Sequence, residues 1–253
     1  MVERFAARQT GSRGGKLRVT IRAVLFDVGG PLDTEEVSER LIDRDIAEAL
    51  ASASLVHTAA DLRRASDAAV ASFAPDAYRA MIWMLSGRDR SVAFAAYGQF
   101  ASNEWRQRRM EERGGIEWRA GIMDVLRALR RDGLLLGLAA NQPATILQEI
   151  ERAGLAGLFG HREVSGHHGH RKPDVRLFLR ACEELGVGPA ECVMVGDRID
   201  NDIAPARSLG MKTVLLRSGR HRAQQPRSWD EEPDVTVFDS QGIADGIEQL
   251  RQR

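Results

Sequence analysis

The sequence predicts an α/β protein with a doubly wound parallel sheet and an α-helical unit inserted after the first strand. Over residues 116–253, short apolar segments alternate with amphipathic helical segments, which implies right-handed crossovers between parallel strands. A first strand is expected at 22–27, where an apolar run ends at a carboxylate and a Gly-Gly-Pro turn. Residues 35–115 are rich in Ala and Arg and lack a strand pattern.

Five segments fit buried strands, because a strand covered on both faces is a continuous apolar run. They are 22–27, 134–140, 192–195, 212–216 and 235–237. In the insert, the Ala-rich and Arg-rich stretches 35–53, 59–73 and 92–109 are predicted to be helices. The expected organisation is a disordered tail at 1–20 with linker composition, a core at 21–34 and 116–253, and a helical insert at 35–115.

Composition narrows the class of protein. The 253 residues can bury a substantial core, and 36 Lys and Arg balance 36 Asp and Glu, which gives no sign of a nucleic-acid partner. The apolar run at 134–140 is too short to span a membrane. Cys182 and Cys192 stand in apolar contexts and predict no disulfide framework. We expect a cytoplasmic protein without a membrane partner, and no pattern indicates its oligomeric state.

Polar residues follow the predicted strands. Ligands of open α/β sheets bind beyond the carboxyl ends of strands. Asp27 ends the first strand, Asn141 follows the second, Asp197 follows a later one with Asp202 five residues on, and Lys172 precedes a helix. Carboxylates suit a hard cation such as Mg²⁺, and a lysine supplies a positive charge for a phosphate. A carboxylate can also act as a nucleophile and form an aspartyl-phosphate.

Four segments, in chain order, resemble the motifs of the haloacid dehalogenase superfamily. They are Phe26-Asp27-Val28-Gly29-Gly30-Pro31-Leu32, Ala140-Asn141, Arg171-Lys172-Pro173-Asp174 and Val195-Gly196-Asp197-Arg198-Ile199-Asp200-Asn201-Asp202. The resemblance covers about residues 22–220, and four ordered motifs at strand ends make it specific. It implies a Rossmann-like core, a helical cap at 35–115 that closes over the substrate, and hydrolysis of a small phosphorylated metabolite.

The resemblance also implies roles for individual residues. Asp27 would attack phosphorus as the catalytic nucleophile. With the Gly29 carbonyl and Asp197, it would hold Mg²⁺, and Asp202 would stand nearby as a further ligand. Lys172 would assist catalysis and bind the phosphate, and Asn141 would be a second substrate-binding residue.

Three positions depart from the family pattern. Gly29 stands where related phosphatases usually carry a second Asp, which acts as general acid and then as base. Ala140 stands where Ser or Thr is usual, and Pro31 replaces a usual Thr. Loss of a general acid or base typically costs about 10²–10⁴-fold in rate. We therefore expect slow turnover that depends on how easily the leaving group departs.

Two alternative functions stay open. A dehalogenase-type hydrolase would use Asp27 on carbon without a metal, although the acidic fourth motif favours a cation. A catalytically idle binding protein is favoured by Gly29 and Ala140. The histidine-rich segment 161–170 could form a transition-metal site, but a solvated loop is the preferred interpretation. The substrate is not indicated by the sequence.

Overall fold

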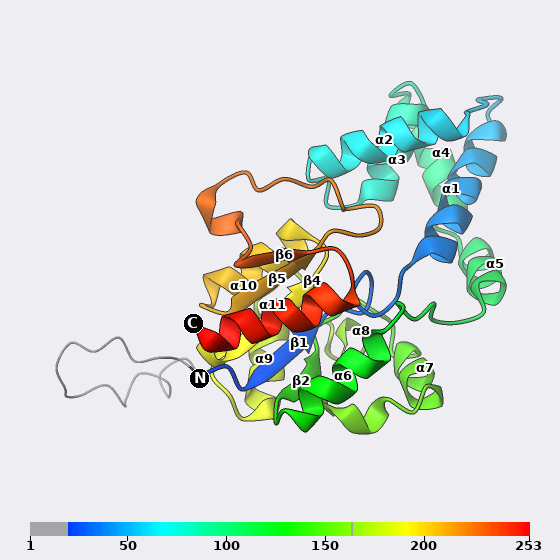
Figure 1. Ribbon diagram of the computed structural model, residues 1–253. Helices are drawn as coiled ribbons and strands as arrows, with labels where there is room; N and C mark the ends of the chain where they lie inside the picture. The colour runs from blue at the N-terminus through cyan, green and yellow to red at the C-terminus, as the bar shows by residue number, and fades with distance from the viewer. Residues whose placement is uncertain (1–19, 163) are drawn as a thin grey trace.

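The computed structural model describes residues 20–162 and 164–253; the predicted tail at 1–19 and residue 163 lie outside the described residues (Figure 1). Six parallel strands form one sheet in the order β3-β2-β1-β4-β5-β6. They are β1 Ala23–Phe26, β2 Leu135–Leu138, β3 Phe159–His161, β4 Cys192–Gly196, β5 Lys212–Leu216 and β6 Val235–Val237. The doubly wound fold is thus confirmed, and its strand order reverses between β1 and β4, where such sheets bind ligands.

Helices cover both faces of this sheet. Successive side chains of a strand point to opposite faces: Val24 and Phe26 pack with α6, α7 and α11, whereas Ala23 and Leu25 pack with α9 and α10. Figure 1 shows α6 and α11 side by side over one face. These helices are α6 Ile122–Arg131, α7 Ile146–Arg152, α9 Arg176–Leu185, α10 Ala204–Ser208 and α11 Ser240–Gln252. Burial on both faces explains why the central strands are continuously apolar.

All five predicted strands are present, but a sixth strand, β3, was missed. This strand pairs with β2 at the edge of the sheet, with a register shift between them. It has three residues, and Gly160 in its middle is exposed. So short a segment carries no apolar run that periodicity could detect. The remaining short elements are η2 Ala156–Leu158, α8 Ser165–His168, η3 Pro189–Glu191 and η5 Trp229–Glu231.

Five helices form the insert, and they differ from the predicted set. They are α1 Glu36–Ala51, α2 Ala59–Ala71, α3 Ala77–Leu85, α4 Arg90–Phe100 and α5 Asn103–Arg113. The single helix expected at 92–109 was wrong: the chain breaks between α4 and α5, where the Ser102 hydroxyl accepts the N–H of Trp105 and begins a new helix. Helix α3 was not predicted, since its nine residues give too short a periodic pattern.

The insert has its own hydrophobic core. Ile46, Leu50, Met81 and Phe100 are buried in a cluster separate from the two that line the sheet. Figure 1 shows α1–α5 as a group of helices joined to the sheet layer by two connecting segments. The exact domain limits stay a prediction. Within the described ranges, no helix is both long and apolar enough to cross a membrane.

A buried carboxylate ties α1 to α5. The Asp45 side chain on α1 has no exposed surface. It accepts hydrogen bonds from Arg44 Nη2 at 2.9 Å, Arg108 Nη2 at 2.6 Å and Arg109 Nη1 at 2.6 Å. A buried charge is costly unless it is paired, so these arginines are required for Asp45 to lie inside the insert.

We predict that Asp45→Ala lowers the free energy of unfolding by about 2–4 kcal/mol. Loss of the Asp45 carboxylate leaves three guanidinium groups without their shared partner. Arg44 and Arg108 are partly exposed to solvent, so water can compensate part of the lost free energy. Urea denaturation would measure it against Asp67→Ala, an exposed aspartate on α2. Equal shifts in the two variants would contradict this account of the network.

Candidate active site

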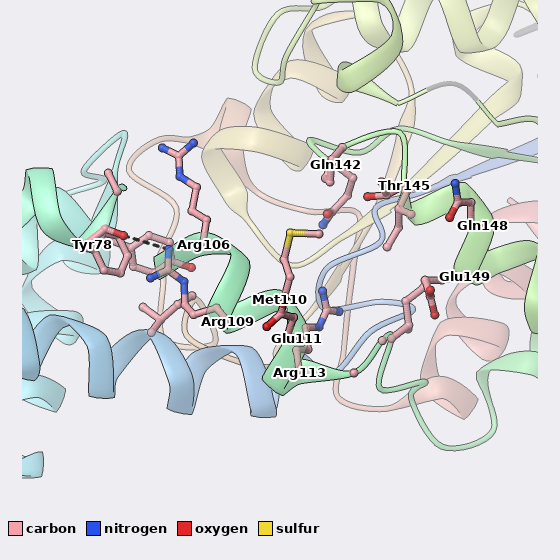
Figure 2. Close-up of a pocket in the computed structure, with 18 of the residues that line it drawn as sticks. Tyr78, Arg106, Arg109, Met110, Glu111, Arg113, Gln142, Thr145, Gln148 and Glu149 are labelled. Carbon is pink, nitrogen blue, oxygen red and sulfur yellow. Dashed lines mark hydrogen bonds between the residues drawn. The ribbon is translucent and has the colours of Figure 1, made fainter. Parts of the chain in front are cut away.

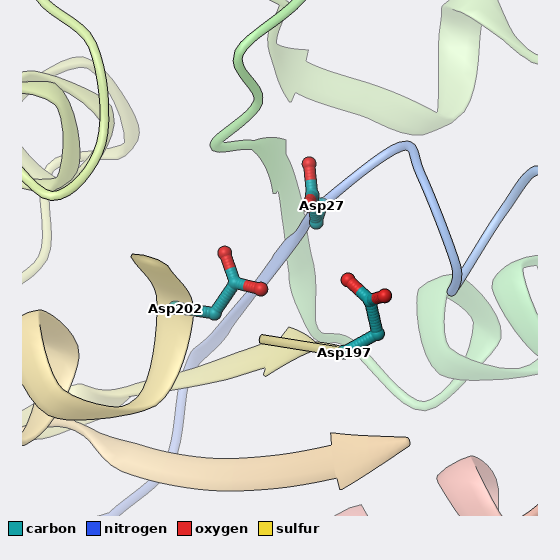
Figure 3. A group of neighbouring side chains, drawn as sticks. All are labelled: Asp27, Asp197 and Asp202. Carbon is teal, nitrogen blue, oxygen red and sulfur yellow. The ribbon is translucent and has the colours of Figure 1, made fainter. Parts of the chain in front are cut away.

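Three carboxylates gather beyond the ends of β1 and β4. Asp27 follows β1, Asp197 follows β4, and Asp202 lies on η4, a π-helical turn at Ile199–Ile203. One ligand atom from each lies within 4.8 Å of the others. Figure 3 shows the three side chains grouped at the ends of the strands. The two strands are adjacent and parallel, and the Asp27 N–H donates to the Val195 carbonyl at 2.9 Å. The strand pairing therefore brings together residues that are far apart in sequence.

Lys172 is the positive charge of this group. Its Nζ lies 2.9 Å from Asp27 Oδ2 and 2.6 Å from Asp202 Oδ1, and its side chain is 1% exposed. Burial alone would lower the pKa of Lys172, but the Asp202 and Asp27 carboxylates raise it above its ordinary value. The lysine is therefore held as an ammonium ion between two carboxylates.

Asn141 holds the backbone of Lys172. The Lys172 N–H donates to Asn141 Oδ1 at 2.8 Å, and Asn141 Nδ2 donates to the Lys172 carbonyl at 3.0 Å. Both polar ends of the amide are thereby engaged with the chain. These contacts give Asn141 a positioning role that the motif pattern did not reveal, and the expectation that it also binds substrate stays a prediction.

Negative charge exceeds positive charge at this site. Burial raises the pKa of Asp27 to about 6, although Lys172 lowers it, and Asp202 raises it further. Burial, with the Asp202 and Asp27 charges, raises the pKa of Asp197 well above its usual range. Three carboxylates with one ammonium group suit an added hard cation with oxygen ligands. The residues that were expected to bind Mg²⁺ through their side chains thus form a suitable donor set.

Two glycines make room for these carboxylates. A Cβ on Gly196 would lie 2.4 Å from the Asp202 Cγ. Gly30 has a φ of +76°, and its Cβ would lie 2.7 Å from that of Asp197. Only a residue without a side chain lets the backbone approach so closely. These glycines are therefore structural requirements of the site.

Gly29 lies beside a carboxylate that the sequence analysis did not single out. A Cβ on Gly29 would lie 2.7 Å from Oε1 of Glu35, at the start of α1. Burial, together with the charges of Asp27 and Glu39, raises the pKa of Glu35 to about 7. No spacing rule relates positions 29 and 35, so a motif pattern could not have identified this neighbour.

The loop after β5 connects the insert to the core at this edge. The Arg220 N–H donates to Glu39 Oε1 at 2.7 Å, and its Nη2 lies 2.8 Å from Asp43 Oδ1, both on α1. Arg220 Nη1 also donates to Ser66 Oγ on α2 at 2.8 Å. One core arginine thereby joins two helices of the insert.

A cavity of about 870 Å³ lies between α4, α5 and the segment that follows Asn141 (Figure 2). Its polar lining comes from both the insert and the core, and includes Tyr97, Arg106, Gln142, Thr145 and Glu149. Such a volume is typical of small-molecule sites. The cavity could therefore accept a small ligand at the junction of insert and core, although Asp27, Asp197, Asp202 and Lys172 are not among its lining residues.

The histidine-rich segment is described in part. His161 is buried on β3, and His170 Nδ1 lies 3.8 Å from Asp174 Oδ2. The side chains of His167 and His168 lie outside the described part of the structure. A transition-metal site at 161–170 therefore stays an untested alternative.

We predict that Asn141→Ala lowers the free energy of unfolding by about 1–3 kcal/mol, because two backbone groups of Lys172 lose their partners. Asn103→Ala, at an exposed position on α5, is the matched control. Thermal and urea unfolding would measure both variants. A cost no greater than that of the control would show that solvent replaces the amide.

A second prediction concerns pH and Asp197. An aspartate whose folded-state pKa is raised contributes stability below its unfolded pKa and loses it as the pH rises through the folded value. In chelator, Asp197→Asn should therefore raise the melting temperature at about pH 8, and this advantage should shrink toward about pH 4. Asp124→Asn, whose parent side chain is 88% exposed, is the control. An advantage that is constant with pH would rule out this electrostatic origin.

Known proteins resemble this chain in sequence. It is 34% identical over 130 residues to the glyceraldehyde 3-phosphate phosphatase of Methanopyrus kandleri, covering 51% of this chain and 56% of the relative. It is 30% identical over 131 residues to the N-acetylmuramic acid 6-phosphate phosphatase of Pseudomonas aeruginosa, covering 51% and 57%. The chain thus spans a little over half the length of these curated relatives.

Solved structures share the fold over nearly the whole chain. A predicted phosphoglycolate phosphatase from Haemophilus somnus has a TM-score of 0.65 at 19% identity, covering 89% of this chain and 97% of that one. A 2-haloacid dehalogenase from Pseudomonas syringae has a TM-score of 0.56 at 20% identity, covering 90% and 99%. Both comparisons concern the fold alone.

The family model of haloacid dehalogenase-like hydrolases matches residues 21–210, which is most of the chain and includes all four motif segments. The chain therefore belongs to the haloacid dehalogenase-like hydrolase family.

Proposed function

We propose that the protein is a Mg²⁺-dependent phosphatase that hydrolyses a small phosphorylated metabolite through an aspartyl-phosphate on Asp27. The observation that carries this proposal is the buried contact of Lys172 with Asp27 and Asp202 beside Asp197. A nucleophilic carboxylate, a phosphate-binding cation and a set of metal ligands are the groups that phosphoryl transfer requires.

Asp27 is oriented for attack. Its Oδ1 accepts the Val28 N–H at 2.8 Å, and its Oδ2 contacts the Lys172 ammonium group at 2.9 Å. These contacts restrict rotation of the carboxylate, and the lysine favours the ionised, nucleophilic form. In the first step an Asp27 oxygen forms a bond to phosphorus while the ester P–O bond breaks. In the second, water attacks phosphorus and frees Asp27 and inorganic phosphate.

The metal would be held by the Asp27 and Asp197 side chains and the Gly29 carbonyl, with Asp202 as a further ligand. When bound, Mg²⁺ neutralises charge on the phosphoryl group during transfer. The excess of three carboxylates over one ammonium group supports this assignment, because a cation offsets it. Lys172 would bind a phosphoryl oxygen, with Asn141 fixing the lysine backbone.

The substrate class rests on the relatives and on the cavity. The named substrates of the curated relatives are phosphorylated small molecules. In this chain, the cavity between insert and core offers Arg106, Gln142 and Thr145 to the part of a substrate that does not react. A cytoplasmic location and closure of α1–α5 over the substrate as a cap belong to the same proposal.

An activity assay with and without a metal chelator distinguishes this proposal from two rival functions. A dehalogenase-type hydrolase would retain activity toward haloacids in chelator. A catalytically idle family member would release no phosphate from any substrate, yet could bind phosphorylated ligands. Phosphate release that stops on chelation and returns with Mg²⁺ would exclude both.

We predict that Asp27→Asn lowers phosphate release at least about 10³-fold, because the amide cannot act as nucleophile. The assay uses p-nitrophenyl phosphate and a panel of phosphorylated metabolites with Mg²⁺, and Asp67→Asn serves as the matched exposed control. Trapping of phosphate on the wild-type protein, localised by mass spectrometry to Asp27, completes the test. Turnover that survives in Asp27→Asn would exclude the covalent mechanism.

A further inference from the structure

The Glu35 carboxylate fills the space beside Gly29. A Cβ on Gly29 would lie 2.7 Å from Oε1, 2.8 Å from Cδ and 2.9 Å from Oε2 of that residue. These contacts are too short for both side chains to coexist without a shift. The absence of a side chain at position 29 therefore coincides with a carboxylate delivered to the same place from position 35.

The chain holds Glu35 in this place by a specific backbone conformation. Glu35 has a φ of 60° and a ψ of 7°, in the left-handed region that few residues other than glycine adopt. Its N–H donates to Asp33 Oδ1 at 3.1 Å. Asp33 is 1% exposed, its Oδ1 also accepts the Glu117 N–H at 3.2 Å, and its Oδ2 pairs with Arg113. An uncommon conformation fixed by a buried network is often found at a functional site.

The Glu35 carboxylate, like that of Asp197, makes no hydrogen bond or ion pair among the described residues, whereas the carboxylates of Asp27 and Asp202 are engaged. Asp202 Oδ1 contacts Lys172, and its Oδ2 accepts the Arg198 N–H at 3.0 Å. Asp27 is engaged at both oxygens. Across residues 20–162 and 164–253, no side-chain or backbone group donates to or pairs with the Glu35 carboxylate. It is thus a carboxyl group near the nucleophile whose oxygens are free to meet a substrate.

We propose that Glu35 is the general acid and base of the reaction, supplied from the junction of core and insert in place of a carboxylate at position 29. This inference rests on the proposed phosphatase function. As Asp27 bonds to phosphorus, the neutral Glu35 carboxyl gives its proton to the departing ester oxygen. The resulting carboxylate then takes a proton from the water that attacks the aspartyl-phosphate, which restores both residues. Position 29 therefore gives no reason to expect slow turnover.

The test compares two aryl esters in Mg²⁺: p-nitrophenyl phosphate, whose leaving group needs little protonation, and phenyl phosphate, which needs more. Glu35→Gln should lower kcat for phenyl phosphate by about 10²–10⁴-fold. For p-nitrophenyl phosphate, the rate of the first turnover should fall by about tenfold or less. This turnover should appear as a burst of p-nitrophenol equal to the enzyme concentration, because the dephosphorylation that follows still lacks its base. Glu36→Gln, the exposed next residue, is the matched control.

A second pair of variants, Glu35→Ala with and without Gly29→Asp, tests the proposal even if the Glu35→Gln variant does not fold. The backbone of Gly29 lies outside the left-handed region, so it can carry a side chain once the Glu35 carboxylate is removed. Glu35→Ala should lose activity toward phenyl phosphate, and Gly29→Asp with Glu35→Ala should regain at least about tenfold. Gly29→Asp by itself should impair activity, since two carboxylates then compete for one space.

The outcomes separate this inference from the proposed function. If Asp27→Asn is inactive but Glu35→Gln matches Glu36→Gln on both esters with no burst, the phosphatase stands and the role of Glu35 is refuted. Equal loss on both esters without a burst, and without recovery in the double variant, would also refute it. If wild-type protein releases phosphate from neither these esters nor any metabolite of the panel, or if Asp27→Asn stays active, the proposed function fails and the role of Glu35 fails with it.

Discussion

The geometry of the candidate site depends on the burial of one ammonium group. Lys172 has almost no exposed surface, and a buried cation is tolerated only where opposite charges and hydrogen bonds compensate it. Asp27, which follows β1, and Asp202, on the turn η4 that follows the adjacent strand β4, supply that compensation. The pairing of β1 with β4 determines how far apart these carboxylates lie. The Asn141 side chain fixes the position of the Lys172 backbone by hydrogen bonds. A change in any one of these contacts would affect the others.

The same group carries an unfavourable excess of negative charge. Asp197 enters a site where Asp27 and Asp202 already share one lysine, and burial raises its pKa. The protein tolerates close approach there through Gly30 and Gly196, which have no side chains to obstruct the carboxylates. Such an arrangement would stabilise a bound cation and would lower the stability of the metal-free fold, because function and stability make opposite demands there.

The helical insert is coupled to this chemistry at two places. One is the junction where Asp33 joins both connecting segments through hydrogen bonds to Glu35 and Glu117. The other is Arg220, whose contacts reach α1 and α2 from the core. A movement of the insert would therefore displace the Glu35 carboxylate relative to Asp27. If the insert closes over the substrate, closure and the delivery of a proton-transfer group are physically linked.

Features that depend on a few neighbouring residues could be predicted from the amino-acid sequence. Apolar runs identified five strands, because a strand buried on both faces must be continuously apolar. Motif order placed Asp27, Lys172, Asp197 and Asp202 at strand or helix ends, where the open sheet brings them together.

Features that depend on contacts between distant residues became visible only in the folded chain. The edge strand β3 is too short to have a pattern of its own and exists through its pairing with β2. Asn141 bonds to a backbone 31 positions away, and so holds Lys172 rather than facing the cavity freely. The Glu35 carboxylate occupies the space beside Gly29 because Glu35 has a left-handed backbone conformation and its N–H is bound by the buried Asp33. A turn's handedness and the filling of a small volume are settled only when the whole chain has packed, because both depend on which groups compete for the same space.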